Sequence, residues 1–450
     1  MSTDIRIKKG LNIKLVGEAD KTTTELPIGN EFALKLADFH RITPKLLARE
    51  KTIVKAGEAL FYNKADDRIL FPSPVSGEVV EVVRGEKRKV LEIKIKADST
   101  QNYHDFGKKD INAMPADEIK AHLLASGCWP FIKQRPYDII ANPDKTPKAI
   151  FISGYDSAPL APDLEYTLKG KEAELQAAIT ALAKLTSGKV HVSVEATTTL
   201  SPFISLSDIE IHKVSGPHPS GNVGTQINKI DPVNKGEAVW TISPQNLVII
   251  GELLLTGKFN AQRVVALTGA QFKNPKYVTA IAGAKIKDIV ADNLKEENTR
   301  IINGNVLTGI KVTEDGYLGY YDYQITAIPE GNDYEFFGWA KPVADKISPT
   351  RALTFSWLFP NKKFNLNTNT NGEHRAFVMT GIYEEVFPFD IYPMQILKSC
   401  LYKDLDEMEA LGIYEVAPED FALTEFVCIS KQPHQKIIRE GLDLMIKEIG

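Results

Sequence analysis

The order strand, helix, strand in the middle of the chain restricts the fold more than any other feature. Residues 149–154 are an apolar run, A-I-F-I-S-G, residues 170–186 place Ala, Leu and Glu at helical spacing, and residues 189–195 read K-V-H-V-S-V-E. A helix between two such strands brings the strands together in parallel. We therefore predict a parallel α/β sheet of the Rossmann type in this part of the chain.

A Rossmann-type domain that binds a dinucleotide needs glycines directly after its first strand, because backbone amides must approach the pyrophosphate. Only Gly154 follows the strand in S-G-Y-D-S-A-P-L-A-P-D, and the carboxylates of Asp156 and Asp163 would repel phosphate. A second glycine cluster, G-P-H-P-S-G-N-V-G at 216–224, has the wrong spacing. We expect a plain strand-to-helix turn there, with a ligand contact as the less favoured alternative.

The rest of the chain forms further domains, because 450 residues exceed the ~250 to 300 at which single cores stop growing. Residues 28–96 are typical of short strands, and a charged turn, R-G-E-K-R-K, joins two strands of a hairpin. We expect Arg84, Lys87 and Arg88 in this turn to be solvated, with a phosphate or lipid contact as the alternative. Further elements are expected as strands within 263–278, a short helix within 281–290, and helices near 394–401 and 435–449.

The chain lacks the sequence motifs of common catalytic and metal sites. It has no G-x-x-x-x-G-K-S/T, H-E-x-x-H or G-x-S-x-G. Its three cysteines, Cys128, Cys400 and Cys428, include no C-x-x-C, which disfavours a disulfide framework, a zinc site and an iron–sulfur site, and fits a reducing cytoplasm. His212 and His218 flank a proline turn and are expected to be structural. From spacing alone, we expect no catalytic residues and no metal ligands.

Charge and hydropathy exclude two classes of partner or location. The formal charge of −4 and the lack of a long basic block argue against nucleic acid as a partner. Spanning a bilayer takes ~20 apolar residues, and the longest apolar run, at 247–255, is interrupted by Gly251 and Glu252. The amino end, M-S-T-D-I-R-I-K-K-G, has no apolar core of signal-peptide length. We expect no transmembrane segment.

Several blocks of residues, in order from one end of the chain to the other, point to one known family. They are I-R-I-K-K-G-L-N-I at the start, F-P-S-P-V-S-G-E-V-V-E-V-V-R-G-E-K-R, S-G-C-W-P-F-I-K-Q-R-P, G-P-H-P-S-G, Q-R-V-V-A-L-T-G, N-G-N-V-L-T-G, Y-L-G-Y-Y and F-F-G-W-A-K-P. Together these blocks resemble the A subunit of the sodium-translocating NADH:quinone oxidoreductases. The layout is also similar to the C subunit of the Rnf complex and to the NADH-binding flavoprotein of complex I.

The resemblance implies an α/β and α+β multidomain protein. Its implied parts are an N-terminal segment (1–28), a barrel-sandwich hybrid of the biotinyl/lipoyl type (29–100), a helix with an aromatic and basic connecting segment (101–148), a Rossmann-like domain (149–255), a β-grasp domain of the SLBB type (256–330) and a helical C-terminal region (331–450).

The resemblance also implies a peripheral subunit on the cytoplasmic face of the bacterial inner membrane, in contact with the B and C membrane subunits of its complex. That complex couples NADH oxidation and quinone reduction to sodium export. This chain is expected to be a non-catalytic scaffold that contributes to quinone binding and binds no cofactor, while other subunits carry NAD, FAD, FMN and iron–sulfur clusters. The alternatives are a free-standing β-grasp ligand-binding protein and a biotin or lipoyl carrier-type enzyme subunit.

Three features differ from the relatives that carry cofactors. Aligning P-V-S-G at 74–77 with the motif of the carriers places Asp66 where their acylated lysine stands, and Lys64 two residues away, so no swinging arm is expected. A glycine-rich cofactor loop of the NADH-binding relatives corresponds to residues 126–136 here, in which large side chains and two prolines take its place. Cys428 alone cannot hold the iron–sulfur cluster that cysteine runs hold in the electron-transfer relatives.

The segment 126–136, S-G-C-W-P-F-I-K-Q-R-P, supplies the candidate site residues. Trp129 or Phe131 would provide an aromatic face for a quinone head group, and Lys133 or Arg135 a donor to its carbonyl oxygens. In the competing interpretation, the two aromatic side chains fill the vacated cofactor cavity and Arg135 pairs with a carboxylate.

Overall fold

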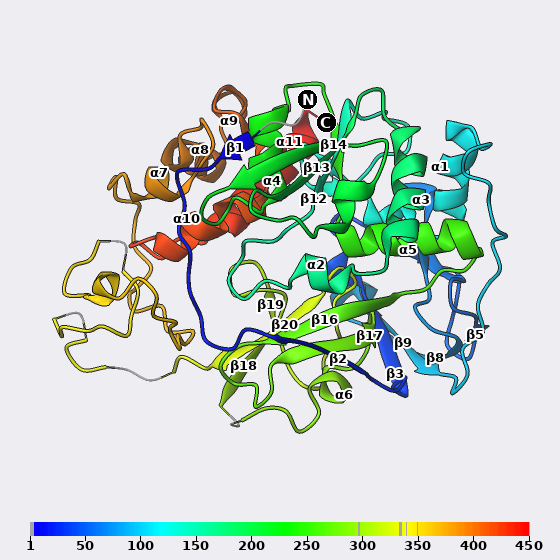
Figure 1. Cartoon of the computed structure of the whole chain (residues 1–450), viewed down its shortest axis with the longest axis horizontal. Coiled ribbons are helices and arrows are strands. Elements are labelled where there is room, and N and C mark those ends of the chain that lie inside the picture. The colour runs from blue at the N-terminus through cyan, green and yellow to red at the C-terminus, as the bar shows by residue number, and fades with distance from the viewer. Residues whose placement is uncertain (1–3, 296–297, 333–334, 339, 349, 450) are drawn as a thin grey trace.

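The structure is a computed structural model that describes residues 4–295, 298–332, 335–338, 340–348 and 350–449. Its parts are arranged around three β-structures and one group of helices (Figure 1). The seven-stranded sheet lies in the upper half of that view and the six-stranded sheet below it. The blue strands of the N-terminal sandwich lie at the lower right, and the orange and red C-terminal helices at the upper left.

Two small antiparallel sheets form the N-terminal sandwich. Phe61 and Phe71 stack with ring centroids 4.4 Å apart, and Phe39 meets the second ring edge-on, so aromatic packing fills the space between the sheets. The four-stranded sheet has the order β3 (Glu31–Lys35), β9 (Val90–Ala97), β8 (Gly77–Arg84), β5 (Ile53–Val54), and the three-stranded sheet the order β4 (Pro44–Leu46), β6 (Ala59–Asn63), β7 (Asp66–Pro72).

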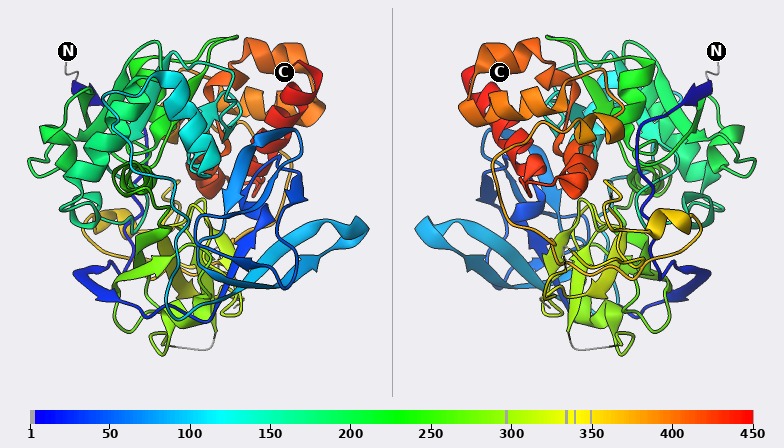
Figure 2. Two further views of the ribbon diagram at one scale, coloured as in Figure 1. Left: turned by 90° about the vertical axis from the view of Figure 1, so that its right-hand side faces the viewer. Right: turned by 90° about the vertical axis from the view of Figure 1, so that its left-hand side faces the viewer.

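The β8–β9 hairpin projects from the body of the molecule (Figure 2). A 3-10 turn, Glu86–Arg88, closes it, and Arg84, Lys87 and Arg88 are exposed. The expectation of a solvated hairpin tip is confirmed.

The central sheet contains the predicted parallel strands. Its order is β1 (Asp4–Arg6), β14 (Glu210–Ser215), β13 (Val190–Glu195), β12 (Ala149–Ser153), β15 (Val239–Thr241), β10 (Lys133–Arg135), β11 (Ile139–Ile140). The first five strands are parallel, whereas β10 runs antiparallel to both of its neighbours. Residues 101–148 therefore do more than connect domains, because they add two strands to this sheet.

Helices cover both faces of the central sheet. Helices α3 (Glu172–Ala183) and α5 (Pro244–Thr256) pack against each other on one face. Helix α4 (Val223–Ile230) packs on the other, where Ile227 joins Phe151 in a small buried cluster. The glycine cluster before α4 is the strand-to-helix turn that the sequence predicts. Two further helices of this region are α1 (Ala116–Ala125) and α2 (Leu164–Thr167), with 3-10 turns η3 (Trp129–Phe131) and η4 (Pro202–Ser205).

The third sheet includes a strand from the beginning of the chain. Its order is β19 (Ile310–Val312), β18 (Thr299–Asn303), β20 (Gln324–Pro329), β16 (Gln262–Thr268), β17 (Lys276–Ile281), β2 (Asp20–Glu25). The short helix α6 (Ile286–Val290) follows β17 as predicted, and a 3-10 turn, η1 (Leu36–Asp38), follows β3. The N-terminal residues thus join two different sheets through β1 and β2.

The C-terminal region carries the expected helices after residue 381, and the described residues before that point are mostly irregular. In the described residues between 335 and 381, the one regular element is a 3-10 turn, η5 (Ser356–Leu358). Proline, glycine and asparagine are frequent there and disfavour helix. The elements after residue 381 are α7 (Ile382–Val386), α8 (Pro393–Tyr402), α9 (Leu405–Ala410), η6 (Ile413–Glu415), η7 (Pro418–Phe421), α10 (Ala422–Val427) and α11 (His434–Glu448).

Amphipathic packing explains the C-terminal helices. Their apolar faces enclose a second buried cluster around Phe387, Phe421 and Met445, which Ile13 and Leu15 of the N-terminal segment complete. None of the helices that the described ranges contain combines the length and the apolar character needed to cross a membrane.

Candidate functional site

A cavity of about 330 Å³ opens where the carboxyl ends of β12 and β15 face the third sheet. In open α/β sheets this edge, outside the carboxyl ends of parallel strands, is where ligands bind. The segments that line the cavity are β10 with Phe131, the turn after β12 at 153–158, residues 218–223, the start of α5 at 241–246, residues 304–308, residues 321–324 and Glu419.

One wall of the cavity is aromatic and carries a cation. The ring of Phe131 is stacked on Tyr320, with centroids 5.1 Å apart and planes inclined by 12°. The Nζ of Lys133 lies 3.9 Å from the centre of the Tyr321 ring, and the Tyr321 hydroxyl donates a 2.8 Å hydrogen bond to the Pro130 carbonyl. Two residues that the sequence proposes, Phe131 and Lys133, therefore line the same cavity.

Lys133 is a cation without a carboxylate partner at ion-pair distance among the described residues. Burial lowers its pKa to about 8, while Asp138 and Asp38 act in the opposite direction. A half-buried ammonium on an aromatic face is stabilised by cation–π attraction and keeps its N–H groups for another acceptor. It is suited to bind a carbonyl or anionic oxygen inside the cavity.

Arg135 also borders the cavity, but its guanidinium is occupied. Its Nη1 donates to Asp420 at 2.6 Å and its Nη2 to Glu419 at 2.5 Å. The side chain is 2% exposed. Arg135 thus pairs with carboxylates, as the competing interpretation of the segment expects, and these two nitrogens are not free to donate to a quinone.

Trp129 lies outside the cavity and is fully buried. Its Nε1 donates to the Ala141 carbonyl at 2.8 Å, and its ring meets Trp240 edge-on at 5.3 Å. Its aromatic face is therefore used in packing between η3 and β15.

Polar groups without partners complete the cavity. Within the described residues, the hydroxyl of Tyr155 and Oδ1 of Asn246 are buried and make no hydrogen bond. Burial raises the pKa of Asp156, and it raises the pKa of Asp322 to about 6 with a further contribution from Asp38. His218 is engaged with Ser157, with 3.0 Å between Nδ1 and Oγ. The site thus offers a donor, an acceptor and a cation around an apolar wall.

Sequence patterns did not identify Tyr155, Asn246 and Tyr321 as site residues. Tyr155 lies two residues after the end of strand β12, and Asn246 lies in the first turn of α5 after strand β15. Residues in these positions meet at the carboxyl edge of a parallel sheet, which is a signal available in the sequence. Tyr321 lies in the loop before strand β20 of the third sheet, and no local pattern predicts that contact.

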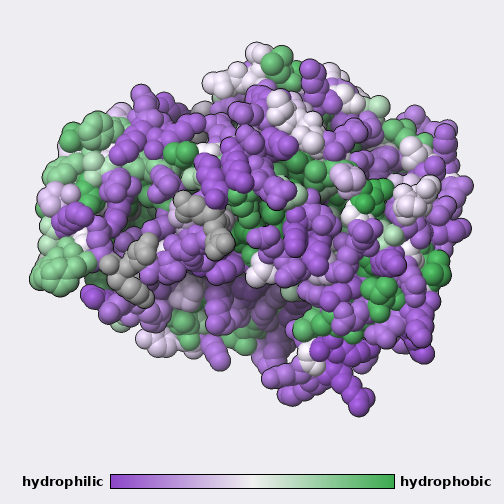
Figure 3. All heavy atoms as spheres, turned by 90° about the horizontal axis from the view of Figure 1, so that it is seen from below, coloured by the Kyte–Doolittle hydropathy of each residue, from purple (hydrophilic) through white to green (hydrophobic). Residues whose placement is uncertain are grey.

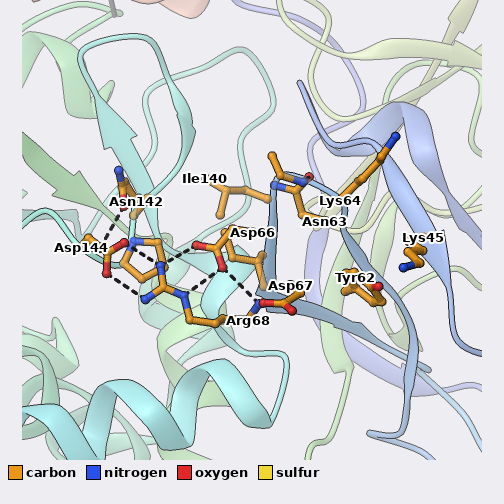
Figure 4. A pocket seen from close by; sticks show the side chains of 14 residues that line it. Lys45, Tyr62, Asn63, Lys64, Asp66, Asp67, Arg68, Ile140, Asn142 and Asp144 are labelled. Atoms are coloured by element: carbon orange, nitrogen blue, oxygen red, sulfur yellow. Dashed lines mark hydrogen bonds and ion pairs between the residues drawn. The ribbon is translucent and has the colours of Figure 1, made fainter.

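A second, open hollow of about 870 Å³ lies beside the β6–β7 hairpin of the sandwich (Figure 4). Arg68 donates to Asp66 and to Asp144 at 2.7 Å each, which ties the hairpin to the loop after β11. Lys64 and Ala65 form the turn between the strands, and both are exposed. The alignment that put Asp66 in the place of the carriers' acylated lysine, which stands at a hairpin tip, is wrong, because Asp66 already belongs to β7 and the tip carries the amine of Lys64.

Models of one protein family match three successive parts of the chain. The NqrA N-terminal barrel-sandwich hybrid domain matches residues 5–98, the NqrA second alpha/beta domain residues 114–259, and the NQRA C-terminal domain, of the SLBB type, residues 264–314. The sandwich, the seven-stranded sheet and most of the third sheet correspond to these three parts.

Three full-length relatives of this chain are A subunits of Na(+)-translocating NADH-quinone reductases. The protein of Neisseria meningitidis strain Z2491 is 36% identical over 447 residues, that of Pasteurella multocida 34% over 447 and that of Serratia proteamaculans 36% over 449. Each alignment covers 99% of this chain and 100% of the relative. Among solved structures, an NAD+-reducing NiFe-hydrogenase in the H2-reduced state matches 51% of this chain and 52% of its own, with 10% identity and a TM-score of 0.33.

Proposed function

Because this chain belongs to the NqrA family, the A subunits of the Na+-translocating NADH-quinone reductases, we propose that it is the non-catalytic subunit whose α/β cavity holds the head group of the quinone. Membership of this oxidoreductase complex follows from the full-length similarity to its named subunits. The proposal concerns what the chain does within that complex.

The observation that carries the proposal is the Lys133 ammonium, held on an aromatic wall inside a cavity of about 330 Å³. A quinone head group is flat and apolar with two carbonyl acceptors at opposite ends. Tyr321 offers aromatic surface beside the buried ring of Phe131, and Lys133 and the unpaired hydroxyl of Tyr155 offer donors. The unpaired Oδ1 of Asn246 would accept a hydrogen bond from the hydroxyl of the reduced form.

The lack of a glycine-rich phosphate loop after β12 supports a chain that carries no nucleotide or flavin. Gly154 stands alone in that turn, and Asp156 at the cavity would oppose a phosphate group. We propose that NAD, FAD, FMN and iron–sulfur clusters are bound by other subunits. The chain then binds quinone without itself transferring electrons from NADH.

An apolar surface supports docking to the B and C membrane subunits on the cytoplasmic face of the inner membrane. Apolar side chains gather at the left end in Figure 3, the end at which the yellow and light-orange segment after residue 335 lies in Figure 1. We call the described residues between 335 and 379 the apolar segment. Exposed contiguous patches of this kind mark interaction sites. Its exposed members include Phe336, Phe355, Trp357, Leu358, Phe359, Val378 and Met379.

The quinone proposal is tested by Lys133→Gln in the assembled complex. A hydrogen bond from a charged donor contributes about 1.5–3 kcal/mol, so the KM for quinone should rise by at least about tenfold. NADH oxidation with an artificial electron acceptor should stay unchanged. Lys45→Gln is the matched control. The Nζ of Lys45 also lies over an aromatic ring, 5.4 Å from the centre of Tyr62, but Lys45 does not line the cavity. An unaltered quinone KM in Lys133→Gln would rule out the cavity as the quinone site.

The position of Lys64 keeps a carrier-type role open as a second candidate. Its amine is exposed at the hairpin tip, where carriers bear their acylated lysine. The ties from Arg68 to Asp66 and Asp144 hold that hairpin against the α/β part, which disfavours a mobile arm. We expect the intact mass of the chain from its native host to equal that of the unmodified polypeptide. A mass increase of one lipoyl or biotinyl group, lost in Lys64→Arg, would instead support the carrier.

A further inference from the structure

Three side chains that could hold a metal ion meet on strands β13 and β14. The strands pair in parallel with His191 opposite Glu210 and Ser193 opposite His212. Because side chains alternate between the faces of a sheet, residues 191, 210 and 212 lie on one face. This is the face of Phe151, which α4 covers.

The distances between the three groups match those between ligands of one ion. His191 Nδ1 lies 3.0 Å from His212 Nε2 and 3.7 Å from Glu210 Oε2, and the three ligand atoms all lie within 4.8 Å of one another. Zinc binds imidazole nitrogen at ~2.0–2.1 Å, which separates neighbouring ligands of a tetrahedral ion by roughly 3.3 Å. The Glu210 side chain is 33% exposed, so its carboxylate is free to turn toward an ion.

The surroundings hold the imidazoles in place. The His191 ring is stacked on Phe151, with centroids 4.9 Å apart and planes inclined by 24°. His212 is 3% exposed, and its Nδ1 has no partner among the described residues, so Nε2 is the nitrogen of that ring that is engaged. Burial lowers the pKa of both histidines, and a metal ion binds the neutral form of imidazole.

We propose that His191, Glu210 and His212 bind a divalent transition-metal ion of the zinc class, with water completing its coordination. Two imidazoles and one carboxylate are a common donor set for such ions. The entrance lies at the half-exposed Glu210.

The ion would join β13 to β14 at the amino-terminal ends of these strands. The quinone cavity lies at the carboxyl ends of the neighbouring strands β12 and β15, so the two sites are separate. The sequence pairs His212 with His218 by proximity, but His218 faces Ser157 at the cavity and the partner of His212 is His191, 21 positions away.

The test uses the full chain, stripped with a chelator and dialysed against Zn²⁺, with metal measured by elemental analysis. One Zn²⁺ per chain should bind and raise the Tm, because an ion that binds only the folded state stabilises it. Co²⁺ in its place should give the visible bands of a tetrahedral nitrogen and oxygen site. Removal of a ligand should weaken Zn²⁺ binding by more than roughly tenfold in His191→Ala, His212→Ala and Glu210→Gln.

His104→Ala is the matched control, since His104 Nδ1 also lies 3.7 Å from a carboxylate, Glu58, but has no third ligand among the described residues. It should keep full Zn²⁺ affinity. If a histidine variant fails to fold, the Zn²⁺ affinity of Glu210→Gln is the measurement that counts. Glu210 is partly exposed and glutamine has nearly the same size and shape as glutamate, so this variant should fold. Zn²⁺ binding that is absent, or that persists undiminished in Glu210→Gln and His191→Ala, would overturn the proposal and leave a hydrogen-bonded histidine pair.

Discussion

Arg135 Nη1 lies 2.6 Å from Asp420 Oδ2, which joins strand β10 to the 3-10 turn η7 across 285 positions of the chain. The same carboxylate oxygen accepts a 2.8 Å hydrogen bond from the Ala417 amide. Burial raises the pKa of Asp420, and the charge of Arg135 opposes that effect. The pair therefore connects the α/β sheet to the C-terminal helices through charges that water does not reach.

Breaking this pair should destabilise the protein strongly. Arg135→Ala leaves the Asp420 carboxylate buried and uncompensated, which we expect to cost about 3–5 kcal/mol in the free energy of unfolding. Urea denaturation measures the change. Arg68→Ala is the control, because the Arg68 side chain is 44% exposed and surface ion pairs contribute at most ~1 kcal/mol. Equal losses in the two variants would contradict the connecting role of Arg135.

Substitutions of Trp129 and of Phe131 should affect stability and quinone binding differently. Trp129→Ala removes a fully buried ring and should cost about 3–5 kcal/mol without a specific effect on quinone. Phe131→Leu keeps an apolar but smaller side chain at a buried position, so it should cost less than Trp129→Ala, about 0.5–3 kcal/mol. Loss of its aromatic face should weaken quinone binding by roughly 2- to 13-fold, corresponding to about 0.5–1.5 kcal/mol.

Quinone titration of the assembled complex and thermal unfolding of each variant provide the two measurements. If Phe131→Leu alters stability but not quinone binding, Phe131 makes no contact with quinone. The aromatic side chains of segment 126–136 then only fill space in the core.

Stability should fall on acidification because of His434. Burial lowers its pKa to about 3, and its Nδ1 lies 2.9 Å from Thr424 Oγ1. The unfolded chain takes up a proton near pH ~6.5, whereas the folded one does not until near pH 3. His434 therefore does not reduce the free energy of unfolding above pH ~6.5. As the pH falls from there toward 3, it lowers the free energy of unfolding by about 1.36 kcal/mol per pH unit.

His434→Gln keeps a hydrogen-bonding side chain and cannot be protonated, so its unfolding free energy should depend less on pH between ~6 and ~4. Chemical denaturation at several pH values gives the slope. A variant with the slope of the original chain would exclude His434 as the titrating group.

The apolar segment should matter for assembly but little for folding. Trp357 and Phe359 are 50% and 52% exposed, so Trp357→Ser with Phe359→Ser should change the unfolding free energy of the isolated chain by no more than ~1 kcal/mol in total. Co-purification with the membrane subunits should be strongly reduced. Leu200→Ser is the control, because Leu200 is 79% exposed, lies outside the apolar segment and should not affect assembly. Undisturbed assembly of the double variant would refute docking through this segment.

The spacing of apolar residues along the sequence predicted those helices and strands in which buried residues recur at a regular interval. The strand at 149–154, the helix within 170–186 and the strand at 189–195 appear as β12, α3 and β13, and β12 and β13 pair in parallel as expected. The helices near 394–401 and 435–449 appear as α8 and α11. Alternation and helical spacing report which side chains face a core, and this information lies within a few neighbouring residues.

The sequence also determined which residue types were available for a site, but not how they would be used. Phe131 and Lys133 line the cavity, whereas Trp129 and Arg135, from the same eleven-residue block, are engaged in packing and in an ion pair. The register of the β6–β7 hairpin likewise places Asp66 in a strand instead of at the expected tip. Alignment by motif does not fix the register of a hairpin, because turn geometry decides it.

Only the tertiary structure decided which distant segments meet. The first 25 residues supply β1 to one sheet and β2 to another, Lys133 lies on Tyr321 from the loop before β20, and His191 faces Glu210 and His212 across a strand pair. A strand carries the same period whichever partner it pairs with, so the sequence determines its faces. Its partner is chosen by the packing of whole layers and by the entropy of closing the loops between them, and neither is recorded in a local pattern.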